Sequence, residues 1–487
     1  MTNSIRPASR AGDVGEPIDI GSRLELFVDE ALIDELSSTT RRLHRPRMRE
    51  CVLTHDQPWE GEKCGYYTIF EDDGRFRLYY FARTLEDGDP GMTVRCYAES
   101  EDGVDWEKPS LGLIEYEGSR ANNIVWGGEG ASNMTPFKDP NAGPDSEARY
   151  KAVGSGEEGL LGFESPDGLD WSLMETNPLF TRDQGAYDSQ NLAFWDPVAE
   201  EYRAYFRYFE DDRRGIKTAT SDDFVTWTDP EPLNYPNSPP EQLYTNVVAP
   251  YYRAPHLLIG FPMRYVERDW ESDSMRQLPG WEKRQERWQH HERYGAAMTD
   301  SLFMSSRDGE TFDRWPRAFL RPGLWERQTA TNWVYGDNEI AWHLIETESR
   351  EPGKPRELSL YATERYWLEN NRLRRFTMRV DGFVSIAAPL DGGEVTTKVL
   401  RFEGDHLQLN FATSAAGSIQ IEFQSPDGNP YPGFELAESP ELFGDHLKHV
   451  VTWPNEHHLG ELSGKPVRMR FVLRDADLYS MRFRNIQ

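Results

Sequence analysis

Short runs of alternating apolar and polar residues fill the chain from about residue 60 to residue 373, with Asp, Gly and Pro between them. The runs are rich in Tyr, Phe, Val and Ile, which is typical of half-buried β-strands. GYYTIFEDDGRFRLYYFAR, at residues 65–83, is the clearest example, with a hairpin turn in its middle. The same order recurs along the chain: strand, hairpin turn, strand, loop, strand, tight turn and a short strand beside a tryptophan.

The tight turn carries a repeated motif. SEDGVDW at residues 100–106 returns as SPDGLDW at 165–171, SDDFVTW at 221–227 and SRDGETFDRW at 306–315. A fifth, degenerate unit runs through TNWVYGDN, EIAWHLIET and ELSLYATE. Four strands and roughly 55–65 residues in a unit predict the blades of a five-bladed β-propeller. We interpret the motif as structural, with Asp-Gly making the turn and Trp packing between neighbouring blades.

One unit is longer than the others because of an insert at about residues 267–294. The insert is charged and rich in Trp, and its pattern is partly helical. It predicts a rim over one end of the propeller or a contact between copies. His290 and His291 are adjacent, so on regular structure they point different ways, and we do not expect them to share a metal ion.

After residue 374 the strands continue but the Trp motif stops, which predicts a β-sandwich. The sequence therefore predicts an all-β protein of two domains, a five-bladed β-propeller at 51–373 and a β-sandwich at 374–487. The segment 1–50 is expected to contribute to propeller closure, through a strand before Trp59, for which SRLELFVDEALI at residues 22–33 is the candidate.

Composition and charge limit the classes of molecule that the protein is expected to bind. The formal net charge is −29 and the pI about 4.8, which disfavours nucleic acid and anionic membranes. Cys51, Cys64 and Cys96 show no CxxC spacing, so reduced structural thiols are expected rather than zinc ligands. No run of 18 apolar residues and no apolar signal-peptide core is found, so a cytoplasmic protein is expected.

In a propeller the first strand of each blade lines the central channel, so polar residues where these strands begin converge on one funnel. Here those positions hold carboxylates, amides and aromatic rings, and Arg residues follow on the second strands. Carboxylates can do acid–base work, amides and Arg can bind hydroxyls, and rings can stack on a sugar. The pattern therefore favours a carbohydrate site.

This layout resembles that of the superfamily formed by glycoside hydrolase families 32 and 43, which have five-bladed propellers, the former with a C-terminal β-sandwich. The resemblance implies hydrolysis of a glycosidic bond by acidic residues in the funnel. The WMNDPNG, RDP and EC motifs of family 32 are absent, and the DPN of FKDPN at 137–141 is interpreted as a turn. No catalytic residue is therefore carried over from the family.

The catalytic candidates come from position alone: Asp188 in YDSQN, Glu60 in PWEG, Asp337 in YGDNEIAW and Glu346 in IET. Glu339 lies in the same YGDNEIAW run and shares the position argument with Asp337. The candidates for substrate binding lie where the first and second strands are expected to begin or end: Trp59, Tyr66, Asn133, Gln190, Asn191, Asn246, Arg207, Arg264, Asn332, Trp333 and His343.

Three functions remain open on the sequence. The first is a glycosidase acting on a small oligosaccharide or glycoside, and the second is a propeller that binds sugars without cleaving them. The third is a protein-interaction propeller. No cofactor or metal is expected, although a structural cation in the channel is compatible with the pattern.

Overall fold

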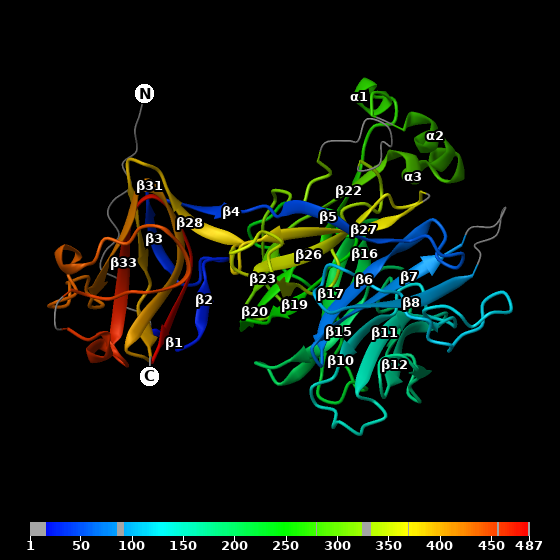
Figure 1. Ribbon diagram of the computed structural model, residues 1–487, viewed down its shortest axis with the longest axis horizontal. Coiled ribbons are helices and arrows are strands. Elements are labelled where there is room, and N and C mark those ends of the chain that lie inside the picture. Colours follow the sequence, from blue (N-terminus) through cyan, green and yellow to red (C-terminus); the bar gives the residue numbers. More distant parts are fainter. Residues whose placement is uncertain are drawn as a thin grey trace. The chain divides into compact units, whose positions relative to one another are not determined.

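The computed structural model describes residues 16–84, 92–278, 280–323, 333–368, 370–454 and 457–485. It divides the chain into two compact units, Arg45–Val380 and Met1–His44 with Asp381–Gln487. Almost all of the regular structure is β-strand, as predicted (Figure 1).

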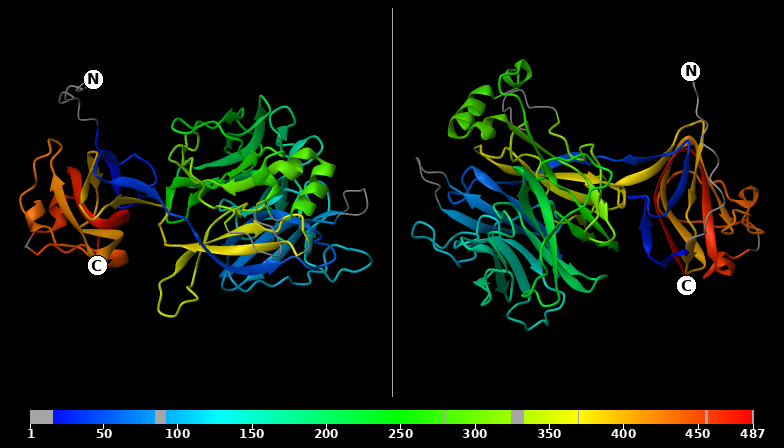
Figure 2. Two further views of the ribbon diagram at one scale, coloured as in Figure 1. Left: turned by 90° about the horizontal axis from the view of Figure 1, so that it is seen from above. Right: turned by 180° about the vertical axis from the view of Figure 1, so that it is seen from behind.

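The unit Arg45–Val380 is a propeller of five blades, each a separate antiparallel sheet of at least four strands (Figures 1 and 2). The first strands β6, β10, β15 and β25 lie next to one another around the axis. Blade one has β6 (Lys63–Asp72), β7 (Arg75–Arg83), β8 (Thr93–Ser100) and β9 (Ile124–Trp126), and blade two has β10 (Thr135–Lys138), β11 (Tyr150–Ser155), β12 (Gly159–Ser165), β13 (Ser172–Leu173) and β14 (Phe180–Thr181). Blade three has β15 (Leu192–Asp196), β16 (Glu201–Glu210), β17 (Arg213–Ser221) and β18 (Glu231–Pro232), and blade four has β19 (Ala249–Tyr251), β20 (Ala254–Gly260), β23 (Met304–Ser306) and β24 (Asp313–Arg314). Blade five has β25 (Ile345–Thr347), β26 (Glu357–Glu364), β27 (Arg372–Met378) and β5 (Arg47–Thr54).

The repeated motif is a structural turn. In blade one, Ser100 Oγ accepts a hydrogen bond from the Gly103 amide at 2.9 Å, and Asp102 Oδ1 accepts from the amides of Val104 and Asp105. The same contacts recur at Ser165, Ser221 and Ser306. The turn needs a positive φ, +73° at Gly103, which glycine adopts without strain.

The same turns join neighbouring blades. A tyrosine on the second strand of one blade donates to the glycine carbonyl of the next turn: Tyr79 to Gly168 at 3.0 Å and Tyr205 to Gly309 at 2.8 Å. Tyr361 of blade five donates in the same way to Gly103 of blade one. The Trp106 ring lies edge-on to Tyr361, with centroids 6.1 Å apart. The motif therefore joins blade to blade, including the first to the last.

A strand before Trp59 closes the propeller, as expected, but it is not the candidate at residues 22–33. β5 completes blade five by pairing with β27, with Leu53 opposite Leu373. The expected segment 22–33 belongs to the other unit, where β2 (Leu24–Leu26) pairs with β33 and β3 (Ile33–Ser37) pairs with β29. RLRRFTM alternates like a sandwich strand and lacks a Trp motif, so its pattern did not assign it to the propeller. The boundaries lie at residues 44 and 380 rather than 50 and 373.

The insert leaves blade four between the paired strands β21 (Met263–Glu267) and β22 (Ala297–Ser301). It forms three helices, α1 (Asp273–Arg276), α2 (Trp281–His290) and α3 (Glu292–Ala296), which stand together on one side of the propeller (Figure 2). The Trp270 ring stacks between Trp281 and Trp288, at 4.6 and 4.2 Å between centroids. This stack holds the segment before α1 against α2.

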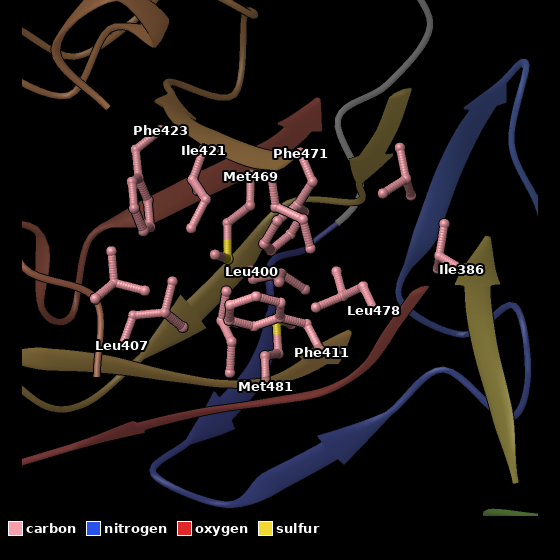
Figure 3. Packing of buried hydrophobic residues seen from close by; sticks show 14 of the residues in the cluster. Ile386, Leu400, Leu407, Phe411, Ile421, Phe423, Met469, Phe471, Leu478 and Met481 are labelled. Atoms are coloured by element: carbon pink, nitrogen blue, oxygen red, sulfur yellow. The ribbon is translucent and has the colours of Figure 1, made fainter. Parts of the chain in front are cut away.

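The second unit is a β-sandwich whose interior is filled by Phe, Leu, Ile, Val and Met (Figure 3). HLQLNFATS and GSIQIEFQS, expected as two strands, form one 19-residue strand with a bulge between Thr413 and Ser418. The strands not yet given are β1 (Ile18–Gly21), β4 (Thr40–Leu43), β28 (Val384–Ala388), β29 (Gly393–Thr397), β30 (Leu400–Phe402), β31 (His406–Gln424), β32 (Asp445–Val450) and β33 (Pro466–Arg484), with 3-10 turns at Leu436–Glu438 and Leu459–Leu462.

Three further observations concern the cysteines, metal binding and membrane spanning. Cys51, Cys64 and Cys96 are free thiols, and the last two are buried. Over the described part of the chain, no group of three or more His, Cys, Asp or Glu side chains is placed to hold a metal ion. Of the helices in the described residues, none has the length and apolar character needed to cross a bilayer.

Candidate functional site

The funnel is the group of side chains around Tyr66, near where the first strands of blades one, three, four and five begin. Tyr66 sits in β6 at φ +48°, where the pairing with β7 is interrupted between Gly65 and Thr68. Its phenol has a raised pKa, mainly through burial and then through Tyr244, Tyr335, Glu339 and Asp188. These groups come from blades three, four and five, and all of them act on one phenol. A strained backbone at such a point is typical of a functional site.

Asp188 is the exposed carboxylate of this group. It directly precedes Ser189 and Gln190, which are buried, and β15 begins four residues after it. Among the described residues, no hydrogen bond or ion pair holds the Asp188 carboxylate. It is therefore free to accept a proton or contact a ligand in the funnel.

Glu339 is the buried carboxyl of the group. Its side chain is about 3% exposed, and Oε1 has no hydrogen-bond partner within the described structure. A methyl group added to Gly65 would lie 3.7 Å from Oε2, so the carboxyl lies against the backbone beside Tyr66. Burial raises the pKa of Glu339 to about 8, and the charge of Arg95 opposes that rise. At neutral pH the carboxyl is therefore protonated and can donate.

Arg95 is a part of the site that the sequence analysis missed. It lies in β8, wholly buried, and its Nη2 donates to the Tyr66 carbonyl at 2.8 Å. Nε and Nη1 have no partner in the described chain, and burial lowers the pKa of Arg95 to about 9. The available signal was a charged residue inside TVRCYAES, between Val94 and Cys96, which are both buried.

Aromatic rings form one side of the funnel. Tyr335 donates from its hydroxyl to that of Tyr244 at 2.8 Å, and the two rings meet edge to face. Tyr66 and Tyr335 both pack against the cluster that holds Tyr244 and Tyr265. The Arg207 guanidinium lies 5.0 Å from the Tyr244 ring centroid. Arg207 is the one candidate arginine that the structure brings to the funnel.

The candidate amides divide into structural and available groups. Asn133 and Asn246 use both ends of the amide on backbone atoms, and so hold strands rather than a ligand. Asn191 donates to the carbonyls of Tyr187 and Ser189, which leaves a buried oxygen. Gln190 donates to the Tyr67 carbonyl at 3.1 Å and keeps a buried, unpartnered Oε1. The oxygens of Gln190 and Asn191 can therefore still accept.

Glu60 does not belong to the funnel. It has no exposed surface and accepts hydrogen bonds from Tyr80 at 2.6 Å, Lys108 at 2.8 Å and two backbone amides, with His55 at 3.3 Å. Burial alone would raise its pKa, but His55 and Lys108 lower it to about 2. With every lone pair engaged, Glu60 is a structural ion and the catalytic assignment is corrected.

Asp337 is also placed elsewhere, because Asn338 has φ +65° and turns the chain between Asp337 and Glu339. Asp337 Oδ1 accepts from the Tyr366 amide at 2.7 Å. Burial raises its pKa, and the Tyr366 amide opposes that rise. Asp337 lines a small hollow with Arg374 and Phe376 of β27, away from the first strands. The strand-like alternation expected for YGDNEIAW fails at this turn.

Glu346 and His343 lie at the other end of the channel. EIAWHLIET, expected as the second strand of blade five, supplies its first strand, β25, which holds Glu346; His343 lies just before it. Glu346 accepts from Tyr252 at 2.6 Å and pairs with Arg356 at 3.2 Å. His343 stacks on Trp342, and burial lowers its pKa to about 3.

Three other candidates are held by the protein itself. Trp59 donates to Asn123 at 2.8 Å, and Trp333 donates to the Gly323 carbonyl at 2.9 Å. Arg264 forms ion pairs with Asp300 at 2.6 Å and Glu241 at 2.7 Å, which consume its guanidinium. Asn332 lies outside the described residues. The funnel thus keeps Asp188, Tyr66, Gln190, Asn191 and Arg207 from the sequence analysis and adds the features around Glu339.

No protein-family model matches the chain, and neither does any curated protein sequence. The chain is similar to several solved structures, among them an RGII complex of BT0996, at 12% identity and TM-score 0.43 over 69% of this chain and 93% of that one. Another is an N-acetylgalactosamine deacetylase from F. plautii in complex with blood group B trisaccharide, at 11% identity and TM-score 0.42 over 69% of this chain and 94% of that one. A third is the catalytic domain of a Coprinopsis cinerea GH62 α-L-arabinofuranosidase, at 9% identity and TM-score 0.42 over 69% of this chain and 98% of that one. These names span a deacetylase and a glycosidase, so the chemistry of this funnel has to come from its own residues.

Proposed function

We propose that the protein is a glycoside hydrolase acting on a small oligosaccharide or glycoside bound in the propeller funnel. The observation that carries the proposal is a pair of carboxyls in opposite environments beside Tyr66. Asp188 is exposed and unpartnered among the described residues, whereas Glu339 is buried with its pKa raised to about 8. Glycosidases use such a pair, one group ionised and one protonated.

The roles follow from these environments. Glu339 donates its proton to the glycosidic oxygen as the bond from C1 to that oxygen breaks. Asp188 takes a proton from the water that attacks C1, or attacks C1 itself before water releases the sugar. The ring of Tyr66 or Tyr244 offers a stacking face, and Gln190 Oε1 offers an acceptor for a hydroxyl. Arg95 stays beneath the site as a fixed positive charge.

The test is a screen of wild-type protein and of the Asp188→Asn and Glu339→Gln variants against aryl glycosides and natural oligosaccharides, in low and molar salt. Release of a sugar by the wild type and not by either variant is expected. Equal turnover by all three proteins would contradict the site. Sugar binding by calorimetry without any product would replace the hydrolase with a carbohydrate-binding propeller.

A further inference from the structure

A second hollow of about 440 Å³ lies between helix α2 and the turn that follows β26 in blade five. Its size falls in the range of roughly 300–1,000 Å³ that is usual for small-ligand sites. The residues that face it are Glu62, Lys283, Glu286, Arg287, His290, Arg365, Trp367 and Leu368. The proposed catalytic pair is not among them.

The two arginines of this hollow keep unused donors. Arg287 is about 6% exposed, and its Nη2 donates to the carbonyls of Tyr366 at 2.6 Å and Trp367 at 2.9 Å. Its Nη1 and the Nε of Arg365 are buried without a partner in the described structure. A buried N–H of a cation that lacks an acceptor is costly, and a ligand oxygen would satisfy it.

The surroundings are positive although the chain as a whole is strongly acidic. Lys63 Nζ lies 3.5 Å from the Trp367 ring centroid. Burial, followed by Arg83 and Arg287, lowers the pKa of Lys63 to about 8, while Glu62 opposes the change. Of the acidic residues that face the hollow, Glu286 is paired with Lys283 at 2.8 Å. Asp337, Glu62 and Glu286 oppose the lowering of the Arg287 pKa, but burial is the larger effect.

Aromatic rings connect the hollow to the funnel. Trp367 has φ +63°, a strained conformation for a bulky residue, and its amide is held by the Glu62 carbonyl at 2.9 Å. Its ring meets Tyr294 edge to face at 5.0 Å, and Tyr294 stacks on Tyr335 at 5.7 Å. Tyr335 is bonded to Tyr244 in the funnel. One run of ring contacts therefore links Tyr244 and Tyr335 to the hollow.

We propose that the hollow lined by Arg287, Arg365 and Trp367 is a subsite for a sugar residue that carries a carboxylate or sulfate group. Guanidinium groups match the geometry of such anions, and the indole offers a face for the sugar ring. The proposal rests on the proposed function, because it places this residue in the same glycan that reaches Asp188 and Glu339.

The experiment measures binding by calorimetry with the full-length Asp188→Asn protein, so that no turnover is needed. One pair of probes is trigalacturonate and its methyl ester, and the other is a sulfated chondroitin disaccharide and its unsulfated form. At least one charged probe should bind about tenfold or more tightly than its neutral partner, the effect of one charge-assisted hydrogen bond. The pair that shows the difference identifies carboxylate or sulfate.

Arg365→Gln, added to the same protein, should abolish that preference. Arg350→Gln is the matched control, because Arg350 is exposed on the same propeller and pairs with Asp102 and Asp105. The subsite would be overturned by equal affinity for charged and neutral probes, by no detectable binding of any charged probe, or by equal effects of the two substitutions. Asp188-dependent hydrolysis of neutral glycosides alone would leave the proposed function standing, whereas Arg365-dependent binding without turnover would leave only the subsite.

Discussion

Two buried glutamates of the same propeller have opposite chemistry. Glu60, in the loop before β6, is fully enclosed, and Tyr80, Lys108, His55 and two backbone amides surround its oxygens. Glu339, before β25, is almost as enclosed, but its Oε1 has no partner in the described chain. The pKa of the first is lowered to about 2, and the pKa of the second is raised to about 8.

The difference shows that burial alone does not define a catalytic carboxyl. Burial raises the pKa of either group, and the number of donors and cations around it decides the outcome. A carboxylate whose partners are complete stabilises the fold, while one left incomplete beside Tyr66 is available for proton transfer. The comparison can be tested by substituting Glu60 and Glu339 separately.

The largest expected effect is on turnover. Glu339→Gln removes the transferable proton and should lower kcat by about 10²–10⁴-fold, the usual contribution of a general acid. Glu60→Gln should leave the kcat of the folded protein near that of the wild type. Steady-state rates on the substrate found in the screen, corrected for the folded fraction by circular dichroism, check this. A loss of kcat in Glu60→Gln equal to that in Glu339→Gln would remove the distinction.

The next effect is on stability, where Glu60→Gln should be the more destabilising of the two substitutions. Glu60→Gln leaves Lys108 and His55 without their carboxylate and should lower the free energy of unfolding by about 3–5 kcal/mol. Glu339→Gln should change it little below pH 4.5, where the carboxyl is protonated in both states, and should raise it at neutral pH, where the unfolded carboxyl ionises and the glutamine does not. Urea unfolding measures both, with Glu210→Gln as the control, whose exposed pair with Arg213 should be worth less than about 1 kcal/mol.

The pH dependence of stability should have opposite signs at the two sites. The folded pKa of Glu60 lies below its usual 4.5, so its stabilisation is complete above 4.5 and is lost as pH falls toward 2. The folded pKa of Glu339 lies above 4.5, so the folded state holds an extra proton and loses stability as pH rises from 4.5 to about 8. Subtracting each Gln variant's unfolding curve from the wild type's isolates these contributions. Curves of the same sign would contradict the assignment.

The smallest effect tests the completeness of the Glu60 environment. Lys108→Met removes one charged donor at 2.8 Å and should cost about 1.5–3 kcal/mol. It should also raise the pKa of Glu60 and move the acid unfolding limb to higher pH. Thermal unfolding between pH 2 and 7 measures both changes. An unchanged acid limb would mean that Lys108 does not hold the Glu60 charge.

The sequence predicted the architecture because each blade carries its own turn chemistry. The SxDG turns and their Trp residues are local, and they recur at readable spacing. Blade five was misassigned by one strand because it lacks the motif, and β5 comes from about 320 residues away in the chain. Pairing over that distance leaves no local signal, since any alternating strand could supply it.

The site could be predicted only in part. Asp188 lies in a polar run before an apolar strand, which sequence reveals. Glu60 stands at a similar position, and its ring of donors comes from Lys108 and Tyr80, which only the fold brings near. Choosing Glu339 over Asp337 required the backbone reversal at Asn338, which is not visible as a pattern.

The central claim is that Glu339 is protonated at neutral pH, and infrared difference spectroscopy tests it without a substrate. The wild-type spectrum minus that of Glu339→Gln should show the carbonyl band of a protonated carboxylic acid at pH 7, which falls to half its full intensity near pH 8. The wild-type spectrum minus that of Glu60→Gln should show only an ionised carboxylate at that pH. Absence of the acid band from the Glu339 difference at pH 7, or its presence in the Glu60 difference, would contradict the account.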